Sequence, residues 1–344
     1  MSKTISAYAC AGKGVPLAPF KYEAKPPGPK DVLIKISHCG ICHSDIHTLD
    51  SGWGPTKYPV VPGHEIVGVV EEIGSDVTRF KVGDRVGVGA QANSCHQCKQ
   101  CKVGGENLCQ KGTFTYNATH PDGRVAYGGY AEAVIVPDEF TFKIPDGLPS
   151  AEAAPLLCAG ITVFAPLKRH MTPGCRVGVI GIGGLGHLAL QFAKALGAVD
   201  VTAITSSAKK VADLNSLGAS KVLVSSDPQA MKKAARSLDV IICTANAPGL
   251  NWEGYFSLLD VGGKLCVVGV PEEPITLSLG SLIFAQTSLV GSLIGSPDEI
   301  ESMLEYAAKH KVLPWIEKTP LSKCNEAIEQ VRKNNVKYRF VLEI

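Results

Sequence analysis

The stretch Arg176-Val177-Gly178-Val179-Ile180-Gly181-Ile182-Gly183-Gly184-Leu185-Gly186 decides the fold of this 344-residue chain. Its first five residues form an apolar run typical of a buried strand, and three glycines follow at the spacing G-x-G-x-x-G. Apolar residues then recur from Leu185 to Leu196 with the period of an amphipathic helix, which Gly197 ends. A strand, a glycine-rich turn and a helix in this order predict the first unit of a doubly wound sheet.

The sequence downstream of this stretch keeps alternating between strand and helix patterns, which predicts a parallel, doubly wound α/β sheet. The expected strands are 201–204, 222–224, 239–243 and 264–268. Towards the C-terminus the pattern predicts helices at 297–310 and 321–333 and a closing strand at 338–342.

The sequence upstream is rich in Gly and Pro and has short β-branched runs, which is typical of a barrel-like β domain. The expected strands there include 32–36, 66–70 and 133–136. We therefore expect a β-rich region before the α/β domain.

The glycine motif predicts a dinucleotide site. The first glycine allows a tight turn, the second lets the backbone approach a pyrophosphate, and the third lets helix and strand pack closely. The helix N-terminus adds unpaired N–H groups and a positive dipole for the phosphates. We expect the cofactor contacts of this turn at Gly181, Gly183, Gly184, Leu185 and Gly186.

The end of the second strand predicts which dinucleotide binds. NAD sites usually place a carboxylate there for the ribose hydroxyls, whereas this chain has Thr205-Ser206-Ser207-Ala208-Lys209-Lys210. Hydroxyls and an ammonium suit a 2′-phosphate, so we expect NADP(H), with Ser206, Ser207 and Lys210 as its contacts. In the alternative interpretation Ser207 only caps a helix and the lysines are solvated.

The spacing Cys95-x2-Cys98-x2-Cys101-x7-Cys109 predicts a closed tetrahedral site for a structural zinc, because four thiolates leave no position for a substrate. An iron–sulfur cluster is the competing interpretation, since it also takes four cysteines.

A second, dispersed set consists of Cys42, His64 and Cys158. Two thiolates and one imidazole leave one position open, as in a catalytic zinc site. From spacing alone these cysteines could equally be small core residues.

Composition limits the other function classes. The formal net charge is +2, which argues against a zinc-ribbon protein that binds nucleic acid through a basic surface. Apolar runs are interrupted before the roughly 20 residues that a membrane span needs, and the N-terminus lacks a signal-peptide pattern. We expect a cytoplasmic protein whose twelve cysteines are metal ligands or core residues rather than disulfides.

The motifs together resemble the zinc-dependent medium-chain alcohol dehydrogenases over essentially the whole chain. The segment Gly63-His64-Glu65-x2-Gly68-x5-Gly74-x2-Val77 matches the zinc signature of that family, and the four-cysteine loop and the glycine turn follow in the family's order. The chain looks most similar to the cinnamyl alcohol dehydrogenase group. The segments that carry this likeness are 39–45, 58–65, 155–163 and 338–341.

This resemblance implies a GroES-like catalytic domain in two pieces, 1–157 and 296–344, around a Rossmann cofactor domain, 158–295. It also implies hydride transfer between NADP(H) and a primary alcohol or aldehyde. It implies that Cys42, His64 and Cys158 hold the catalytic zinc, with Glu65 beside it as a transient ligand. It also implies a proton relay through Ser44 and His47, and an orienting role for Asp45. An NAD(H)-linked alcohol or polyol dehydrogenase is the alternative.

The resemblance also implies further contacts and a homodimer. The implied cofactor contacts are Ser44, Thr162, Thr244, Gly269, Ser292, Leu293 and Ile294. The dimer would form along the edge of the cofactor sheet near 289–294. His96, at a position where related loops often have Gly, is expected to face solvent, and Trp53 is expected to be either a wall of the substrate pocket or a structural residue.

Overall fold

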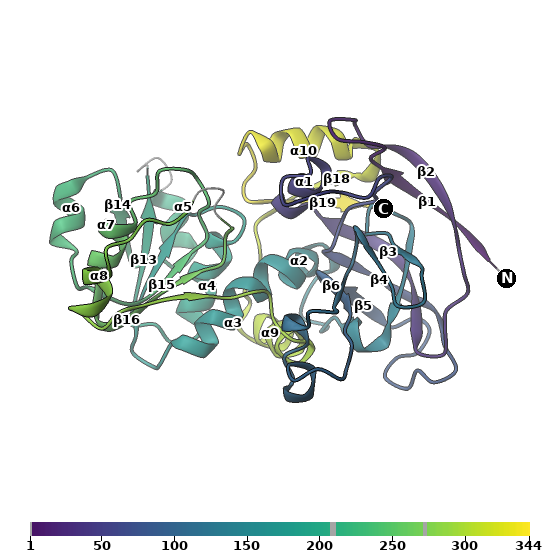
Figure 1. Ribbon diagram of the computed structural model, residues 1–344, viewed down its shortest axis with the longest axis horizontal. Helices are drawn as coiled ribbons and strands as arrows, with labels where there is room; N and C mark the ends of the chain where they lie inside the picture. The colour runs from purple at the N-terminus through teal and green to yellow at the C-terminus, as the bar shows by residue number, and fades with distance from the viewer. Residues whose placement is uncertain (1, 207–210, 271–273) are drawn as a thin grey trace. The chain divides into compact units, whose positions relative to one another are not determined.

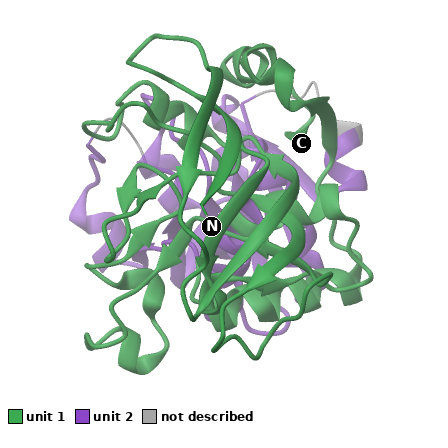
Figure 2. Ribbon diagram, turned by 90° about the vertical axis from the view of Figure 1, so that its right-hand side faces the viewer, with its two compact units in different colours: residues 1–158, 295–344 green, residues 159–294 purple. Residues whose placement is uncertain are grey.

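The computed structural model describes residues 2–206, 211–270 and 274–344 (Figure 1). The chain divides into two compact units (Figure 2). Unit 1 consists of Met1–Cys158 and Gly295–Ile344, and unit 2 of Ala159–Ile294. Cys158, which we expected to begin the cofactor domain, is thus the last residue of the first segment of unit 1.

Unit 1 is built on a seven-stranded sheet in which two strands from the last part of the chain continue a sheet formed by strands from the first part. Its order is β11 (Phe142–Lys143), β5 (Arg85–Val88), β4 (Ile66–Ile73), β3 (Asp31–Gly40), β19 (Arg339–Glu343) and β18 (Ile316–Pro320), and β10 (Ala133–Pro137) also pairs with β3. Strand β3 is apolar on both faces, because it lies in the middle of the sheet and packs on both sides. Its buried residues join one continuous core with β4, β10 and the C-terminal helix.

The other elements of unit 1 are short and surround this sheet. The remaining strands are β1 (Lys3–Ala9), β2 (Ala18–Ala24), β6 (Gln91–Asn93), β7 (Thr113–Phe114), β8 (Ala118–Thr119) and β9 (Val125–Ala126). The helical elements are α1 (His43–Leu49), η1 (Cys101–Val103), η2 (Glu106–Leu108), η3 (Asp138–Phe140), α2 (Ser150–Pro155), α9 (Pro297–His310), η6 (Leu321–Lys323) and α10 (Cys324–Arg332). Helix α9 begins with a capping box, Ser296 and Glu299, and Pro297 at its first position, all favourable at a helix start.

Unit 2 contains the expected doubly wound sheet, so the predicted fold class is confirmed. Its six strands have the order β14-β13-β12-β15-β16-β17 and all pair in parallel, which is the 3-2-1-4-5-6 order of dinucleotide-binding sheets. The strands are β12 (Arg176–Ile180), β13 (Asp200–Thr205), β14 (Lys221–Val224), β15 (Leu238–Cys243), β16 (Leu259–Val267) and β17 (Ser288–Gly291). The helices are α3 (Ile161–His170), α4 (Gly186–Ala195), α5 (Val211–Ser216), α6 (Pro228–Lys233), α7 (Trp252–Ser257) and α8 (Leu279–Ile283).

One helical stretch corrects an expectation from the sequence. The consecutive segments α2, η4 (Leu156–Gly160) and α3 form a run, Ser150–His170, that by length and composition could cross a membrane. Pro155 is the last residue of α2 and Pro166 lies inside α3, but neither interrupts the helical run. Within its most apolar window, 89% of the run is buried inside the protein, so its apolar character is that of a core helix.

Candidate metal centres and cofactor site

Four buried side chains of unit 1 converge on one point. Cys42 immediately precedes α1, His64 and Glu65 precede β4, and Cys158 lies in the single π-helical turn η4. One donor atom from each residue lies within 4.8 Å of the others, and His64 Nε2 is 3.1 Å from Cys158 Sγ. Two sulfurs, one imidazole and a carboxylate are a donor set that zinc prefers, so the residues present fit the metal.

Asp45 organises this centre from the first turn of α1. Its carboxylate is fully buried and accepts hydrogen bonds from the backbone N–H of Cys42 at 2.9 Å and of Gly63 at 3.0 Å. It also lies 3.1 Å from His64 Nδ1. Because Nδ1 donates to Asp45, the lone pair of Nε2 points towards the two sulfurs, which is the orientation that a metal needs. The structure thus places Asp45 in the orienting position that we expected.

Glu65 is held by a residue to which the sequence analysis gave no role. Arg339 Nη2, from β19, donates to Glu65 Oε1, and both side chains are almost completely buried. Burial raises the pKa of Glu65 to about 7, against the opposing charge of Arg339. Oε2 has no hydrogen-bond partner among the described residues, so it remains available to a cation.

The space for Glu65 depends on a glycine. A Cβ atom on Gly40 would lie 1.9 Å from Glu65 Oε2, so no larger residue fits there with this carboxylate orientation.

One feature of the sequence could have pointed to Arg339. It is a charged residue inside the apolar strand Tyr338–Leu342, and a charge in that position needs a buried partner. No feature of the sequence pointed to Tyr116, whose buried ring lies 5.5 Å from that of His64.

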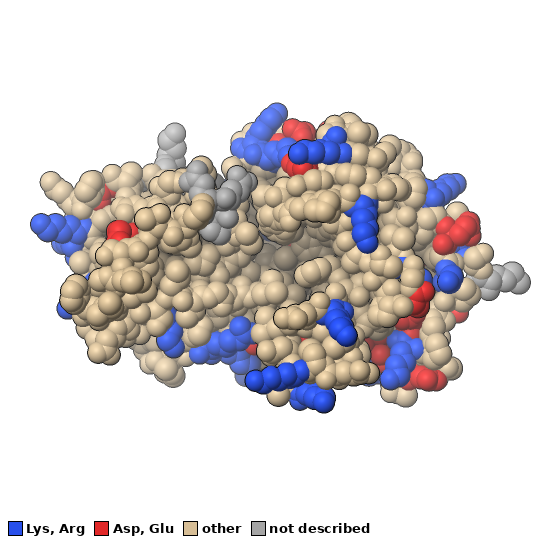
Figure 3. Space-filling view, in the orientation of Figure 1, with Lys and Arg blue, Asp and Glu red and all other residues tan. Residues whose placement is uncertain are grey.

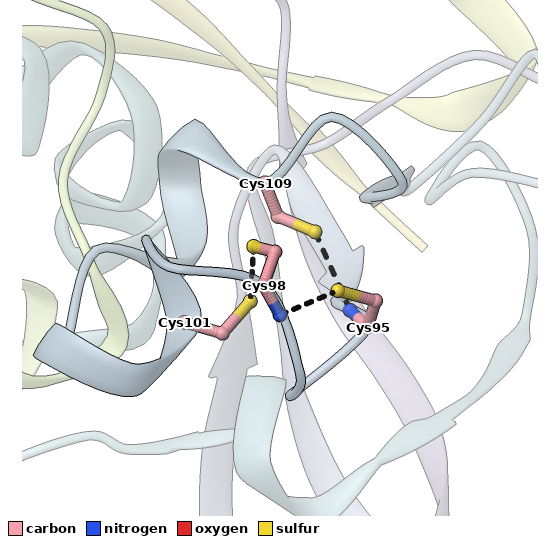
Figure 4. Close-up of side chains that lie close together, drawn as sticks. All are labelled: Cys95, Cys98, Cys101 and Cys109. Atoms are coloured by element: carbon pink, nitrogen blue, oxygen red, sulfur yellow. Dashed lines mark hydrogen bonds between the residues drawn. The ribbon is translucent and has the colours of Figure 1, made fainter.

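The four cysteines of the loop 95–109 form the second candidate metal site (Figure 4). Their sulfurs lie within 4.8 Å of one another, with Cys98 and Cys101 at 3.5 Å. Backbone N–H groups of the loop, those of Gln97 and Cys98, lower the pKa of Cys95 to about 6, which favours the thiolate that zinc binds. The donor set again fits zinc, and the expectation of two metal sites is confirmed.

His96 does not belong to that donor set. Its backbone is left-handed, with φ of 54°, which explains why glycine suits this position. Its side chain is half exposed, and Nδ1 lies 3.3 Å from a carboxylate oxygen of Glu139. It therefore faces outward from the metal site.

The two residues of the expected proton relay lie on α1. Ser44 Oγ is 3.5 Å from Cys42 Sγ, next to the first metal centre. The imidazole of His47, one helical turn further on, stacks on the indole of Trp53. Their relay function stays a prediction.

The glycine turn of unit 2 has the geometry that the motif predicts. Gly181 has a φ of +83°, and a Cβ atom on Gly186 would lie 2.0 Å from the carbonyl oxygen of Gly181. A Cβ atom on Gly183 would meet nothing within 4 Å, so this backbone faces open space where a phosphate can approach. Thr244, at the end of β15, donates from Oγ1 to the carbonyl oxygen of Gly181 at 2.7 Å and secures the turn.

The end of β13 carries the expected nucleotide-selecting residues. Ser206 is exposed, and its carbonyl oxygen accepts from Ser226 Oγ at 3.4 Å. Ser207 and Lys210 lie outside the described residues. Nearby, the carboxylate of Asp227 is engaged in capping α6, where it accepts from two backbone N–H groups.

The remaining expected cofactor contacts all lie in unit 2 and stay predictions. Thr162 is buried in α3, and Gly269 follows β16. Ser292 Oγ accepts from Arg169 Nη1 at 3.2 Å. Leu293 is half exposed, whereas Ile294 is buried, with a φ of 37°.

The face drawn in Figure 3 gives no support to a nucleic-acid interface. On the face drawn in Figure 3, the Lys and Arg side chains are scattered among uncharged residues, and Asp and Glu lie close to several of them. A groove that holds a phosphate backbone gathers basic side chains instead.

Comparisons with known proteins agree with this geometry. Family models described as "Alcohol dehydrogenase GroES-like domain" and "Zinc-binding dehydrogenase" match residues 28–146 and 184–309. The chain is 47% identical to 8-hydroxygeraniol dehydrogenase of Catharanthus roseus, over 95% of this chain and 91% of the relative. It is 46% identical to NADP-dependent alcohol dehydrogenase C 1 of Mycolicibacterium smegmatis, over 99% and 98%. A cinnamyl alcohol dehydrogenase structure from Sorghum bicolor superposes with a TM-score of 0.95 at 42% identity, over 99% and 98% of the two chains.

Proposed function

This chain belongs to the zinc-containing medium-chain alcohol dehydrogenases, close to the cinnamyl alcohol dehydrogenases, and from that premise we propose that it interconverts primary alcohols and aldehydes with NADP(H). An aromatic, cinnamyl-type aldehyde is the first substrate to test. The observation that carries the proposal is the buried set Cys42, His64, Glu65 and Cys158, whose donor atoms lie within 4.8 Å of one another. Cys42, His64 and Cys158 would leave one position of a tetrahedral zinc for a substrate oxygen whenever Glu65 does not occupy it, which is typical of a catalytic zinc site.

The residues of the chain then have distinct tasks. When bound, zinc supplies a Lewis acid for the substrate oxygen and NADPH supplies the hydride. Ser44, whose hydroxyl lies beside Cys42, exchanges a proton with that oxygen, and His47 passes it outward. Asp45 fixes the His64 ring through Nδ1, and Arg339 balances the charge of Glu65 inside the core.

Three observations support NADP(H) over NAD(H). Thr205 and Ser206 stand at the end of β13, where NAD sites usually carry an acidic residue. The nearby Asp227 is committed to a helix cap. A relative of nearly the same length is named an NADP-dependent enzyme.

We also propose a homodimer in the cytoplasm. Strand β17 is one of the two outer strands of the described sheet of unit 2, so its backbone can accept another strand. Large apolar side chains are exposed on and near it: Leu279, Ile283, Phe284, Leu289 and Leu293. An apolar edge of this kind fits a second copy of the chain. All twelve cysteines lie in the described part of the chain and none forms a disulfide, which supports a reducing compartment.

The test is the initial rate of cinnamaldehyde reduction with NADPH and with NADH, together with the zinc content. We expect about two zinc ions per chain and NADPH-selective reduction. Cys42→Ala should abolish the rate and remove about one zinc ion, whereas Cys175→Ala, which changes a thiol outside both sites, should leave both unchanged. An equal or faster rate with NADH would favour the NAD(H)-linked alternative. The absence of any rate over a panel of aldehydes, with two zinc ions present, would contradict the proposal.

A further inference from the structure

Trp53 makes a specific contact that a pocket wall would not need. The ring centroids of Trp53 and His47 are 4.5 Å apart, and the ring planes differ by 17°. This is a stacked arrangement within the distance at which aromatic pairs stabilise each other. Trp53 is nevertheless 52% exposed, so its position is not imposed by a surrounding core.

The backbone after α1 is shaped to bring the indole over the imidazole. Ser51 has a φ of 53°, and Gly52 N donates to the carbonyl oxygen of His47 at 2.7 Å, so the chain turns back at once. A Cβ atom on Gly52 would lie 3.2 Å from His47 Nδ1. The glycine therefore leaves the imidazole the room that the stack requires.

The charged groups near His47 are largely occupied by one another. Asp50, the residue that caps the C-terminus of α1, would favour a protonated imidazole, but both its oxygens are engaged by Arg332 of α10, one at 2.8 Å. Arg332 also contacts Glu329 at 3.2 Å. His43 of α1 and Lys13 are the other charged or titratable groups that act on this cluster. The indole is thus the partner that contacts the ring itself.

We propose that Trp53 is a positioning residue of the proton relay: it holds the imidazole of His47 in one orientation and stabilises its protonated form through the indole face. The proposal rests on the function proposed above, in which His47 passes the proton. An indole face attracts a cation stacked on it, so the stack favours the state that the relay needs when an aldehyde is reduced. Trp53 acts through His47 and need not touch the substrate.

The first test needs no substrate. Protonated imidazole stacked on indole quenches its fluorescence, so the emission of the zinc-loaded enzyme should rise with pH as His47 loses its proton. Both His47→Gln and Trp53→Phe should remove this change. Trp315→Phe, which deletes an indole packed near Tyr338 instead, should retain it. A pH-dependent emission that persists in both of the first two variants would overturn the proposal.

The second test separates positioning from pocket lining. A positioning role predicts that Trp53→Leu lowers kcat for aldehyde reduction by about 2- to 5-fold, the rate equivalent of one exposed cation–π contact. The loss should be the same for propanal and cinnamaldehyde and larger in alkaline solution, and Trp53→Phe should recover most of the rate.

A raised KM for cinnamaldehyde alone, with kcat unchanged for both substrates, would show that Trp53 only lines the pocket and would overturn the proposal. If no aldehyde is reduced by the unmodified enzyme, the proposed function fails. In that case the fluorescence titration still tests whether the indole of Trp53 stacks on the protonated imidazole of His47.

Discussion

At the scale of single residues, two glycines of one turn have different reasons to be glycine. Gly186 packs against its own chain, since a Cβ atom would lie 2.0 Å from the carbonyl oxygen of Gly181. Gly183 has open space at its Cβ position. Gly186 is therefore needed for folding and Gly183 for the ligand, although the motif alone does not distinguish the two roles.

Gly183→Ala and Gly186→Ala should therefore fail in different ways. We expect Gly183→Ala to retain the melting temperature and to raise the KM for NADPH at least tenfold, because the added methyl group points where the phosphates approach. Gly186→Ala should lower the melting temperature by several degrees, because the backbone must move. Thermal unfolding without cofactor and NADPH titration measure the two effects. Equal loss of stability in both variants would contradict this division.

At the scale of elements, an ion pair links the end of α1 to the end of α10. Asp50 and Arg332 form two hydrogen bonds, and Arg332 holds the pKa of Asp50 below its ordinary value of 3.8. Because the folded-state pKa is depressed, the stabilisation is present above about pH 4 and is lost as the pH falls through the lowered value. Both side chains are about a third exposed, so water screens the pair.

We expect Arg332→Leu to cost at most about 1 kcal/mol of unfolding free energy at pH 7. Denaturant unfolding at pH 7 and pH 3.5 should show the difference from the unmodified protein shrinking in acid. Glu329→Gln, which removes the second acidic partner of Arg332, serves as the control and should have the smaller effect at pH 7. A difference that grows in acid would contradict the assignment.

We expect the order of the four-cysteine loop to depend on a bound metal. Between Cys95 and Cys109 the regular structure consists of two 3-10 turns, η1 and η2, and most side chains are exposed or half-buried. Such a segment buries too little apolar surface to offset its own ordering entropy.

Cys98→Ser should therefore make the loop a substrate for trypsin at Lys99, Lys102 or Lys111, with loss of about one zinc ion. Cys42→Ala, which disables the other centre, should lose one zinc ion and leave the loop resistant. Limited proteolysis with mass spectrometry gives the cleavage sites. First cleavage outside residues 95–112 in Cys98→Ser would contradict this expectation.

At the scale of the whole molecule, the exposed apolar edge of unit 2 predicts the assembly. Phe284, which precedes β17, is 88% exposed. Leaving so large an apolar side chain in water costs free energy that burial in an interface would recover. Phe284→Asp should convert the proposed dimer to a monomer, measured by light scattering after gel filtration. Val103, an apolar residue on the cysteine loop, is 72% exposed, so Val103→Asp is the matched control and should leave the dimer intact. A monomer for the unmodified chain would contradict the dimer.

The same scale shows what the sequence could predict. Features encoded in contiguous stretches of sequence could be predicted. The strand and glycine turn at 176–186, the cluster of four cysteines and the helix at 297–310 all lie where expected. The contacts that could not be predicted from the sequence depend on how the folded chain brings residues together. Arg339 reaches Glu65 across 274 positions because β19 lies beside β3, and the Trp53 stack follows from a turn whose φ values no periodicity reveals.

The place of β19 beside β3 also constrains how the protein is made. Leu342 pairs with Cys39 and Val341 with Gly40, so β3 can pair with β19 only after the long intervening part of the chain has been synthesised. Until then Glu65 lacks Arg339, its buried counter-charge. During synthesis the edge of β3 that later pairs with β19 is therefore unpaired. An unpaired strand edge of this kind can aggregate or bind chaperones. The buried pair of Glu65 and Arg339 can therefore form only after β19 has been synthesised, long after the segments that carry Cys42 and His64.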